Sequence, residues 1–369
     1  MRRKAMRNES AHMNHRQPEP VHPRRRTREG AGPSSNAGAV VRTLFGTAVA
    51  LAIALSLPTR EAAAKEEWIS AHSQDHPLAG TIWTSDFQPV TIGQLEAAVA
   101  KAGFVLLGET HNNPDHHRLQ ARLINGLVQS GRRPAVVFEM IPADLQAGLD
   151  RYLQGGAAEA SGLGKILRWE ERGWPDWTIY QPIAEAALPA KLPLLAGGLD
   201  ADAQKALAKA EPPEPYAQMR EQLGLTQPLE PQIAERQGRE IKEGHCNLLP
   251  DTAMEPMIRV QRARDGYMAK TMLSAKGGDG TVLIAGAGHV RRDWAVPRVI
   301  QRMSADAAMV AVAFIEVDPE QTVASEYIEA IPGLQKPYDF IYFTPRADLT
   351  DHCAELEKHL KSKKAKPAG

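Results

Sequence analysis

Six short hydrophobic runs recur along the chain, and each is apolar throughout instead of alternating with polar residues. Strands that are buried on both faces have this pattern. The runs are Phe104–Gly108, Ala135–Glu139, Leu192–Gly197, Thr281–Gly286, Val310–Val317 and Asp339–Phe343. We therefore predict six strands of a mainly parallel sheet.

The segments between several of these runs have helical periodicity. After the first run, Asn113 is a suitable N-cap and Pro114 suits the first turn of a helix. One apolar stripe follows, made of Leu119, Leu123, Ile124, Leu127 and Val128. Because strands alternate with helices, we expect an α/β fold in which helices cover the sheet.

The middle of the chain has a different pattern. Residues 143–276 contain one clear strand, and the rest is helical or proline-rich, as in EPPEPYAQ and TQPLEPQ. We interpret this part as a helical insertion within a domain that covers residues 65–350.

The N-terminal region is basic and ends in a hydrophobic run. Residues 1–64 hold 11 basic and 4 acidic residues, so residues 65–369 hold 33 basic and 40 acidic ones. This balance argues against a nucleic-acid-binding protein. The apolar run Leu44–Leu57 is shorter than the roughly 20 residues of a membrane span. With the small residues Glu61–Ala64 after it, it predicts a signal peptide and export to the periplasm or envelope.

Alternatives for the two ends of the chain stay open. The apolar run could instead be an uncleaved N-terminal anchor. No cysteine lies near Pro58–Lys65, so a lipid anchor is not expected. Cys246 and Cys353 are the two cysteines, and they could pair in an oxidising compartment. The tail at residues 351–369 lacks apolar periodicity, and we predict that it is disordered and basic.

Titratable residues follow three of the predicted strands. The first strand leads to Gly108, Glu109 and His111, the second ends at Glu139, and the fourth leads to Gly286, Gly288 and His289. Ligands of parallel sheets collect at the carboxyl ends of the strands. We therefore expect these side chains to form one site.

The protonation of the histidines after the first strand follows from their position. His111, His116 and His117 lie at the start of the predicted helix, where free N–H groups disfavour an imidazolium. We predict that all three favour the neutral form. Because adjacent helical residues diverge by about 100°, at most one of His116 and His117 should face the site.

Two further clusters each allow two interpretations. Gln261 and Asp265 share a helix face with Met268 and Met272, so they either hold a loop or reach the site. The stretch WEERGWPDWTIYQP contains three tryptophans and Tyr180. It either caps the core or forms a wall for a planar ligand.

Four segments resemble a known family. VLLGETHNNPDHHRLQ, VVFEM with the following Gln146, VQRARDGYMAKTML and IAGAGHVRRDWAVPR are similar to the ChaN-like haem-binding uptake proteins. This family belongs to a superfamily with erythromycin esterases and the Tiki/TraB group. The resemblance runs from Phe87 to Phe343 and implies a three-layer α/β/α core built from two related halves. The stretch AGGLD departs from the pattern, since an amide residue is expected there.

The resemblance implies haem binding for iron uptake at the bacterial envelope. Tyrosine is a candidate iron ligand in this branch, which points to Tyr180 and Tyr267. The other candidates for cofactor binding are Arg118, Gln261 and Asp265. The expected partners are haem or another small molecule, with an envelope protein or a second copy of the chain as further possibilities.

The alternative is a hydrolase that depends on a divalent metal, and whether the chain is an enzyme stays open. In hydrolytic branches the equivalent His and Glu positions carry catalysis. Here His111, Glu139 and His289 would hold the ion, and Glu109 would polarise a water molecule.

Overall fold

The computed structural model describes residues 67–156, 158–275 and 278–365. Contacts divide the chain into two units, Met1–Ala62 and Ala63–Gly369, and the described residues belong to the second. The predicted leader at residues 1–64 lies outside the described residues. Among the helices that are described, none has the length and apolar character of a membrane span.

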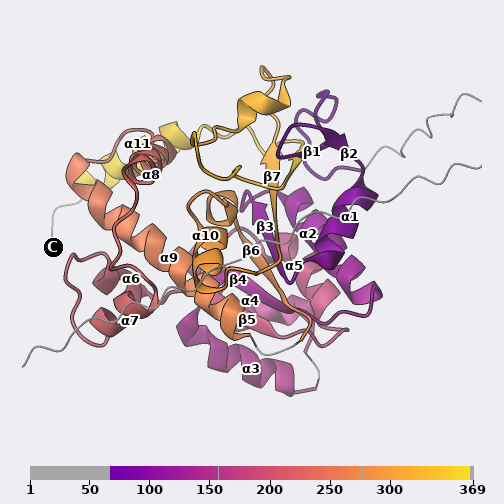
Figure 1. Ribbon diagram of the computed structural model, residues 1–369, viewed down its shortest axis with the longest axis horizontal. Coiled ribbons are helices and arrows are strands. Elements are labelled where there is room, and N and C mark those ends of the chain that lie inside the picture. The colour runs from indigo at the N-terminus through magenta and orange to yellow at the C-terminus, as the bar shows by residue number, and fades with distance from the viewer. Residues whose placement is uncertain (1–66, 157, 276–277, 366–369) are drawn as a thin grey trace, which may run out of the picture. The chain divides into compact units, whose positions relative to one another are not determined.

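An eight-stranded sheet forms the centre of the described unit (Figure 1). Its order is β2-β1-β8-β7-β3-β6-β4-β5. The six strands numbered β3 to β8 are all parallel to one another. The strands are β1 (Ile82–Thr84), β2 (Pro89–Val90), β3 (Phe104–Glu109), β4 (Ala135–Pro142), β5 (Leu194–Gly198), β6 (Thr281–Gly286), β7 (Met309–Glu316) and β8 (Phe340–Thr344). The predicted α/β class and all six predicted strands are confirmed. The antiparallel β1 and β2 were missed because they are too short to form hydrophobic runs.

Helices cover both faces of the sheet. The core on one face joins Leu107 of β3 to α1 (Ile92–Lys101), α2 (Pro114–Gln129) and α5 (Trp177–Ala187). The core on the other face joins the neighbouring Leu106 to α9 (Met254–Ser274) and α10 (Val296–Met303). Both leucines are fully buried, as expected for a strand between two helical layers.

The middle of the chain is helical apart from β5. Its α-helices before α9 are α3 (Gln146–Gln154), α4 (Leu163–Ile166), α5, α6 (Ala201–Leu207), α7 (Tyr216–Gln222) and α8 (Pro231–Gly244). The edge strand β5 is partly capped by a side chain. The Gln146 amide donates to the Leu194 carbonyl at 3.1 Å and accepts from the Ala196 N–H at 2.6 Å. An amide therefore satisfies backbone groups of an exposed edge.

The C-terminal segment differs from the expected disordered tail. Helix α11 covers His352–Ala365, and a disulfide joins Cys353 to Cys246 just after α8. Figure 1 shows α11 beside α8. A Glu357–Lys361 pair one turn apart supports the helix. Local charge pairing and the covalent tether thus replace the apolar periodicity on which the prediction was based.

Gly108 lets the turn after β6 approach β3 closely. A Cβ atom at this position would lie 2.4 Å from Val290 Cγ2 and 2.9 Å from Ala287 Cα. Both neighbours belong to the 3-10 turn η5 (Ala287–Val290). Any larger residue at position 108 would push η5 away from the sheet.

We predict that Gly108→Ala lowers the free energy of unfolding by about 1–3 kcal/mol, because of overpacking. Gly126→Ala is the control, since a Cβ there meets nothing within 4 Å on α2. That change should raise stability by about 0.5–1 kcal/mol. Urea unfolding measures both, and equal effects of the two changes would contradict the close approach.

Candidate functional site

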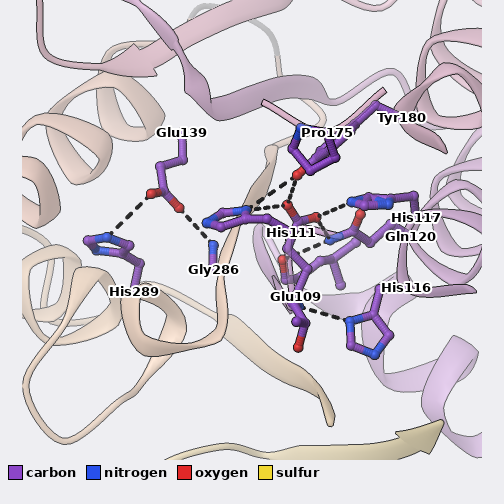
Figure 2. Close-up of polar contacts among 12 residues, drawn as sticks. Glu109, His111, His116, His117, Gln120, Glu139, Pro175, Tyr180, Gly286 and His289 are labelled. Carbon is purple, nitrogen blue, oxygen red and sulfur yellow. Dashed lines mark hydrogen bonds and ion pairs between the residues drawn. The ribbon is translucent and has the colours of Figure 1, made fainter. Parts of the chain in front are cut away.

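Strand order brings the three predicted strand exits together. β6 lies between β3 and β4 in the sheet, and all three run in parallel. Glu109 and Gly286 therefore end β3 and β6, and Glu139 lies near the end of the neighbouring β4, so all three lie at one edge of the sheet. Figure 2 shows the side chains that meet there.

Glu139 joins three elements at this edge. Its Oε2 accepts from the Gly286 N–H at 2.7 Å, and its Oε1 lies 3.5 Å from His289 Nε2. Arg264 of α9 donates to the same Oε1. The Glu139 side chain is only 2% exposed, so these groups take the place of water around the carboxylate.

The surroundings of Glu139 favour its charged form. Burial alone would raise the pKa of this carboxyl group. His289, Arg264, His111 and the Gly286 N–H together lower it to about 2. The carboxylate is therefore ionised at neutral pH.

His289 is oriented by a second acid. Its Nδ1 lies 2.6 Å from Asp265 Oδ1, and both side chains are almost fully buried. Because a carboxylate accepts, Nδ1 carries the hydrogen and Nε2 points towards Glu139. Burial raises the pKa of Asp265, although His289 and Arg264 oppose this shift. Of the two interpretations of Asp265, the structure shows the one that reaches this site.

Glu109 is the centre of a second network. Its Oε1 accepts from the Tyr180 hydroxyl at 2.6 Å and lies 2.9 Å from His111 Nδ1. Its Oε2 accepts from Gln120 Nε2 at 2.7 Å and lies 3.4 Å from His117 Nε2. The Glu109 side chain is fully buried, so the geometry supports a role in holding His111 more than the predicted role of polarising a water molecule.

For His111 the expected shift of the pKa towards the neutral form was wrong in direction. Burial lowers the pKa of His111, but the hydrogen bond to Glu109 and the charges of Glu139 and Glu109 raise it overall. Two buried carboxylates next to the ring outweigh the field of the helix N-terminus.

His116 and His117 have lowered pKa values, as predicted, but the main cause is burial. The pKa of His116 lies well below its usual value, and that of His117 falls to about 4. His116 accepts from the Thr110 N–H and contacts Thr344, whereas His117 lies beside Glu109. One of the two histidines thus faces the network, as helical geometry requires.

Gly286 separates the two networks. A Cβ at this glycine would lie 3.2 Å from His111 Nε2 and 3.7 Å from Glu139 Oε2. His111, Glu139 and His289 therefore surround a single strand exit, although they are far apart in the sequence.

Two of the cavities along α9 are lined by residues that the sequence analysis singled out. One of about 250 Å³ lies between α8, α9 and η5, and its lining includes Gln261, Asp265 and His289. The other, of about 570 Å³, lies between α9, α3 and the β5 edge, and Tyr267 lines it.

The predicted cofactor residues are spread over different places. Tyr180 is fully buried and its hydroxyl donates to Glu109, which places it poorly for binding a ligand. Tyr267 is half-buried at the larger cavity. The Gln261 Oε1 accepts from Arg264. Arg118 is not brought to the site, because it donates to Asp115 and to the Glu67 carbonyl on the outer side of α2.

The tryptophan cluster caps the core. Trp169 and Trp177 are buried and pack edge-on at 4.8 Å between ring centres. Trp174 is half-buried and lies 5.0 Å from the His111 ring. The cluster therefore packs under a loop, where Trp169 also packs against Tyr180 at 4.7 Å between ring centres, and Trp174 is the tryptophan of the three that lies beside His111.

The predicted metal site finds no support. No group of three or more His, Cys, Asp or Glu in the described ranges is arranged to hold an ion. At Glu139 both oxygens already accept from Gly286 and Arg264, so the carboxylate is engaged by protein donors.

In the stretch AGGLD, where an amide residue was expected, the structure gives a steric reason for the glycine at position 198, the last residue of β5. A Cβ at Gly198 would lie 2.5 Å from the Glu139 carbonyl and 3.0 Å from that of Ile141. Close contact with β4 therefore excludes a side chain at this corner.

Several residues of the site were missed in the sequence. Arg264 precedes Asp265 in the quoted helix, and Gln120 lies one turn after His116 on α2. Both donate to a buried acid, Glu139 and Glu109 respectively. The available signal for such donors was a basic or amide residue on the same helix as a predicted site residue, either adjacent to it or one turn away.

Comparisons with known proteins identify relatives of the chain. A family model described as haem-binding uptake, Tiki superfamily, ChaN matches residues 95–300. The structure described as cofacial heme binding to ChaN of Campylobacter jejuni has a TM-score of 0.53 at 18% identity, over 71% of this chain and 95% of that one. A mutant of the erythromycin esterase EreC has a TM-score of 0.38 at 16% identity, over 74% and 99%. A search of curated proteins found no match.

We predict that Glu139→Gln lowers the free energy of unfolding at pH 7 by about 3 kcal/mol. The pKa of Glu139 is depressed from 4.5 to about 2, so its stabilisation is complete above pH 4.5 and is lost as the pH falls towards 2. The difference between the variant and the wild type should shrink over that range. Urea unfolding at a series of pH values measures this, with the exposed Glu235→Gln as control. A difference that is independent of pH would show that Glu139 is not a buried anion.

Proposed function

The chain belongs to the haem-binding uptake (ChaN) family of the Tiki superfamily, and we propose that it is an exported protein that binds haem for iron uptake at the bacterial envelope. The family expected from the four sequence motifs is confirmed. The family model covers most of the site residues, including the β3, β4 and β6 exits and helix α9.

The observation that carries the proposal is Tyr267 in the larger cavity. This cavity has a volume of about 570 Å³, which lies within the range of roughly 300–1,000 Å³ that is usual for ligand pockets. A tyrosine oxygen is one of the protein ligands of haem iron. Of the two tyrosines considered from the sequence, Tyr267 lines a cavity, whereas Tyr180 donates to Glu109 inside the protein.

Three further residues of the cavity lining fit haem. Pro193 and Leu195 provide apolar wall, as a porphyrin face requires. Lys270 lies one turn after Tyr267 on α9 and supplies a cation for a haem carboxylate. In the structure Lys270 Nζ donates to Gln222 at 2.7 Å, so a neutral amide holds the ammonium group near the cavity.

The disulfide supports export as part of the proposal. Cys246 and Cys353 are bonded, and disulfides persist mainly in oxidising compartments such as the periplasm. The signal peptide and the absence of a lipid anchor stay predictions from the sequence, as do a homodimer and an envelope partner protein.

A hydrolase is the second candidate, and one observation favours it. The Asp265–His289 pair lines the smaller cavity, and a histidine that is oriented by an acid is a common general base. Haem binding is the better supported of the two, because it is the description of the matched family.

We predict that haemin produces a saturable shift of its visible absorption band when it is titrated with the protein. Tyr267→Phe should weaken binding by about tenfold or more, because the iron loses its oxygen ligand. Tyr216→Phe is the matched control, since Tyr216 packs in the same apolar cluster but does not line the cavity.

Two outcomes would contradict the proposal in different ways. Equal haemin affinity of Tyr267→Phe and the wild type would exclude Tyr267 as the ligand. A wild-type protein that gives no saturable shift would exclude haem binding itself, and the hydrolase candidate would then be tested with His289→Ala.

A further inference from the structure

A cavity of about 290 Å³ borders α9 apart from the two cavities described above. It lies between α6, α7 and the first half of α9, and the loop Leu225–Pro228 closes one side. Figure 1 shows α6 and α7 together beside α9. Its lining shares no residue with the larger or the smaller cavity. Any ligand bound here would therefore occupy a separate site.

Three arginines form the charged wall of this cavity. Arg259 and Arg262 lie one turn apart on α9, and Arg220 comes from α7. Residues three apart on a helix are neighbours, so the two guanidinium groups of α9 repel each other. Residues 65–369 hold 33 basic and 40 acidic residues, so a basic cluster is not a general property of this chain.

The positive charges of this wall are poorly compensated. Glu255 is the one carboxylate among the described residues that line the cavity. Its Oε2 lies 3.6 Å from Arg259 Nη1, and its side chain is 78% exposed, so this pair is weak. Arg220 and Arg262 form no ion pair with a carboxylate in the described part of the chain. Three cations and one anion leave a surplus of two positive charges.

Arg262 shows the effect of this crowding. Burial and the charges of Arg302 and Arg220 lower the pKa of the Arg262 guanidinium, whereas Asp265 and Glu255 oppose the shift. The opposing carboxylates do not cancel it. An anion in the cavity would therefore stabilise the charged wall.

Backbone carbonyls hold the three guanidinium groups in place. Arg220 donates to Ala210, Arg259 to Ala208 and Arg262 to Gln227. A carbonyl is a neutral acceptor, and each guanidinium has five N–H donors, so most of the donors stay free for a ligand. All three arginines keep some exposed surface, and none of their nitrogens is both closed off and unpartnered, so a ligand in the cavity can reach them.

We propose that this cavity binds a phosphate group, which Arg220, Arg259 and Arg262 hold through charge-assisted hydrogen bonds. At neutral pH a phosphate group carries a charge of about −1.5 to −2 and has three strong acceptor oxygens. It thus matches both the surplus of charge and the number of guanidinium groups. Guanidinium forks also fit phosphate oxygens in pairs. The volume of about 290 Å³ leaves room for free phosphate or for the phosphate end of a small ester.

Calorimetric titration of the full chain with sodium phosphate, at neutral pH and constant ionic strength, tests the proposal. Sodium acetate is the comparison probe, because acetate has a single charge and two acceptor oxygens. Phosphate should bind at least about tenfold more tightly than acetate. Equal affinity for the two anions, or no saturable binding of phosphate, would overturn the proposal.

A titration with methyl phosphate distinguishes the two sources of the group. An affinity for methyl phosphate that equals or exceeds that for inorganic phosphate assigns the site to a phosphate ester. A lower affinity assigns it to free phosphate. Either result supports the phosphate site, since the same three arginines hold the group.

Arg262→Gln separates a ligand role from a structural one. Phosphate affinity should fall about tenfold or more, because one cation and its free donors are lost. Phosphate should raise the melting temperature of the wild type but hardly that of the variant, since only a bound ligand stabilises the fold. Arg151→Gln is the control, because Arg151 is exposed on α3 and does not line the cavity. An equal rise in melting temperature for Arg262→Gln and the wild type would contradict the site.

Glu255→Gln should have the opposite effect on affinity. It removes the carboxylate of the lining, so phosphate should bind several-fold more tightly than to the wild type. Glu235→Gln on α8 is the matched control, since Glu235 is exposed and does not line the cavity. Unchanged or weaker phosphate binding by Glu255→Gln would show that the anion does not bind in this cavity.

Discussion

The buried carboxylate of Glu139 is the interaction on which the rest of the site depends. It lies near the end of β4, accepts from the N–H of Gly286 at the end of β6, and pairs with Arg264 of α9. A buried anion is tolerated only when it is paired and hydrogen-bonded, so these elements must meet at one point. His289 and His111 then take their places around Gly286.

This interaction also fixes the position of helix α9, which lines both cavities described with the candidate site. Arg264 and Asp265 anchor this helix to the sheet edge through Glu139 and His289. Asp265 lines the smaller cavity, and Tyr267, two residues further along the helix, lines the larger one. One anchored helix thus presents different side chains to two cavities.

Much of the fold could be predicted from the sequence because buried parallel strands have continuous hydrophobic runs. The grouping of His111, Glu139 and His289 followed from the rule that ligands collect at the carboxyl ends of parallel strands. The raised pKa of His111 could not be predicted, since it depends on the hydrogen bond that the Glu109 side chain makes and on the charge of Glu139, which is distant in the sequence. The partners of two candidate ligand residues, Asp115 for Arg118 and Glu109 for Tyr180, could not be predicted, because the sequence does not show which way a helical side chain points.

The central claim is that α9, anchored by Glu139, presents Tyr267 to haem. Resonance Raman spectra of the ferric haemin complex, excited in the Soret band, report the iron ligand directly. The account predicts vibrations of an iron-bound phenolate that disappear in Tyr267→Phe. A spectrum of imidazole ligation, or phenolate vibrations that persist in that variant, would contradict it.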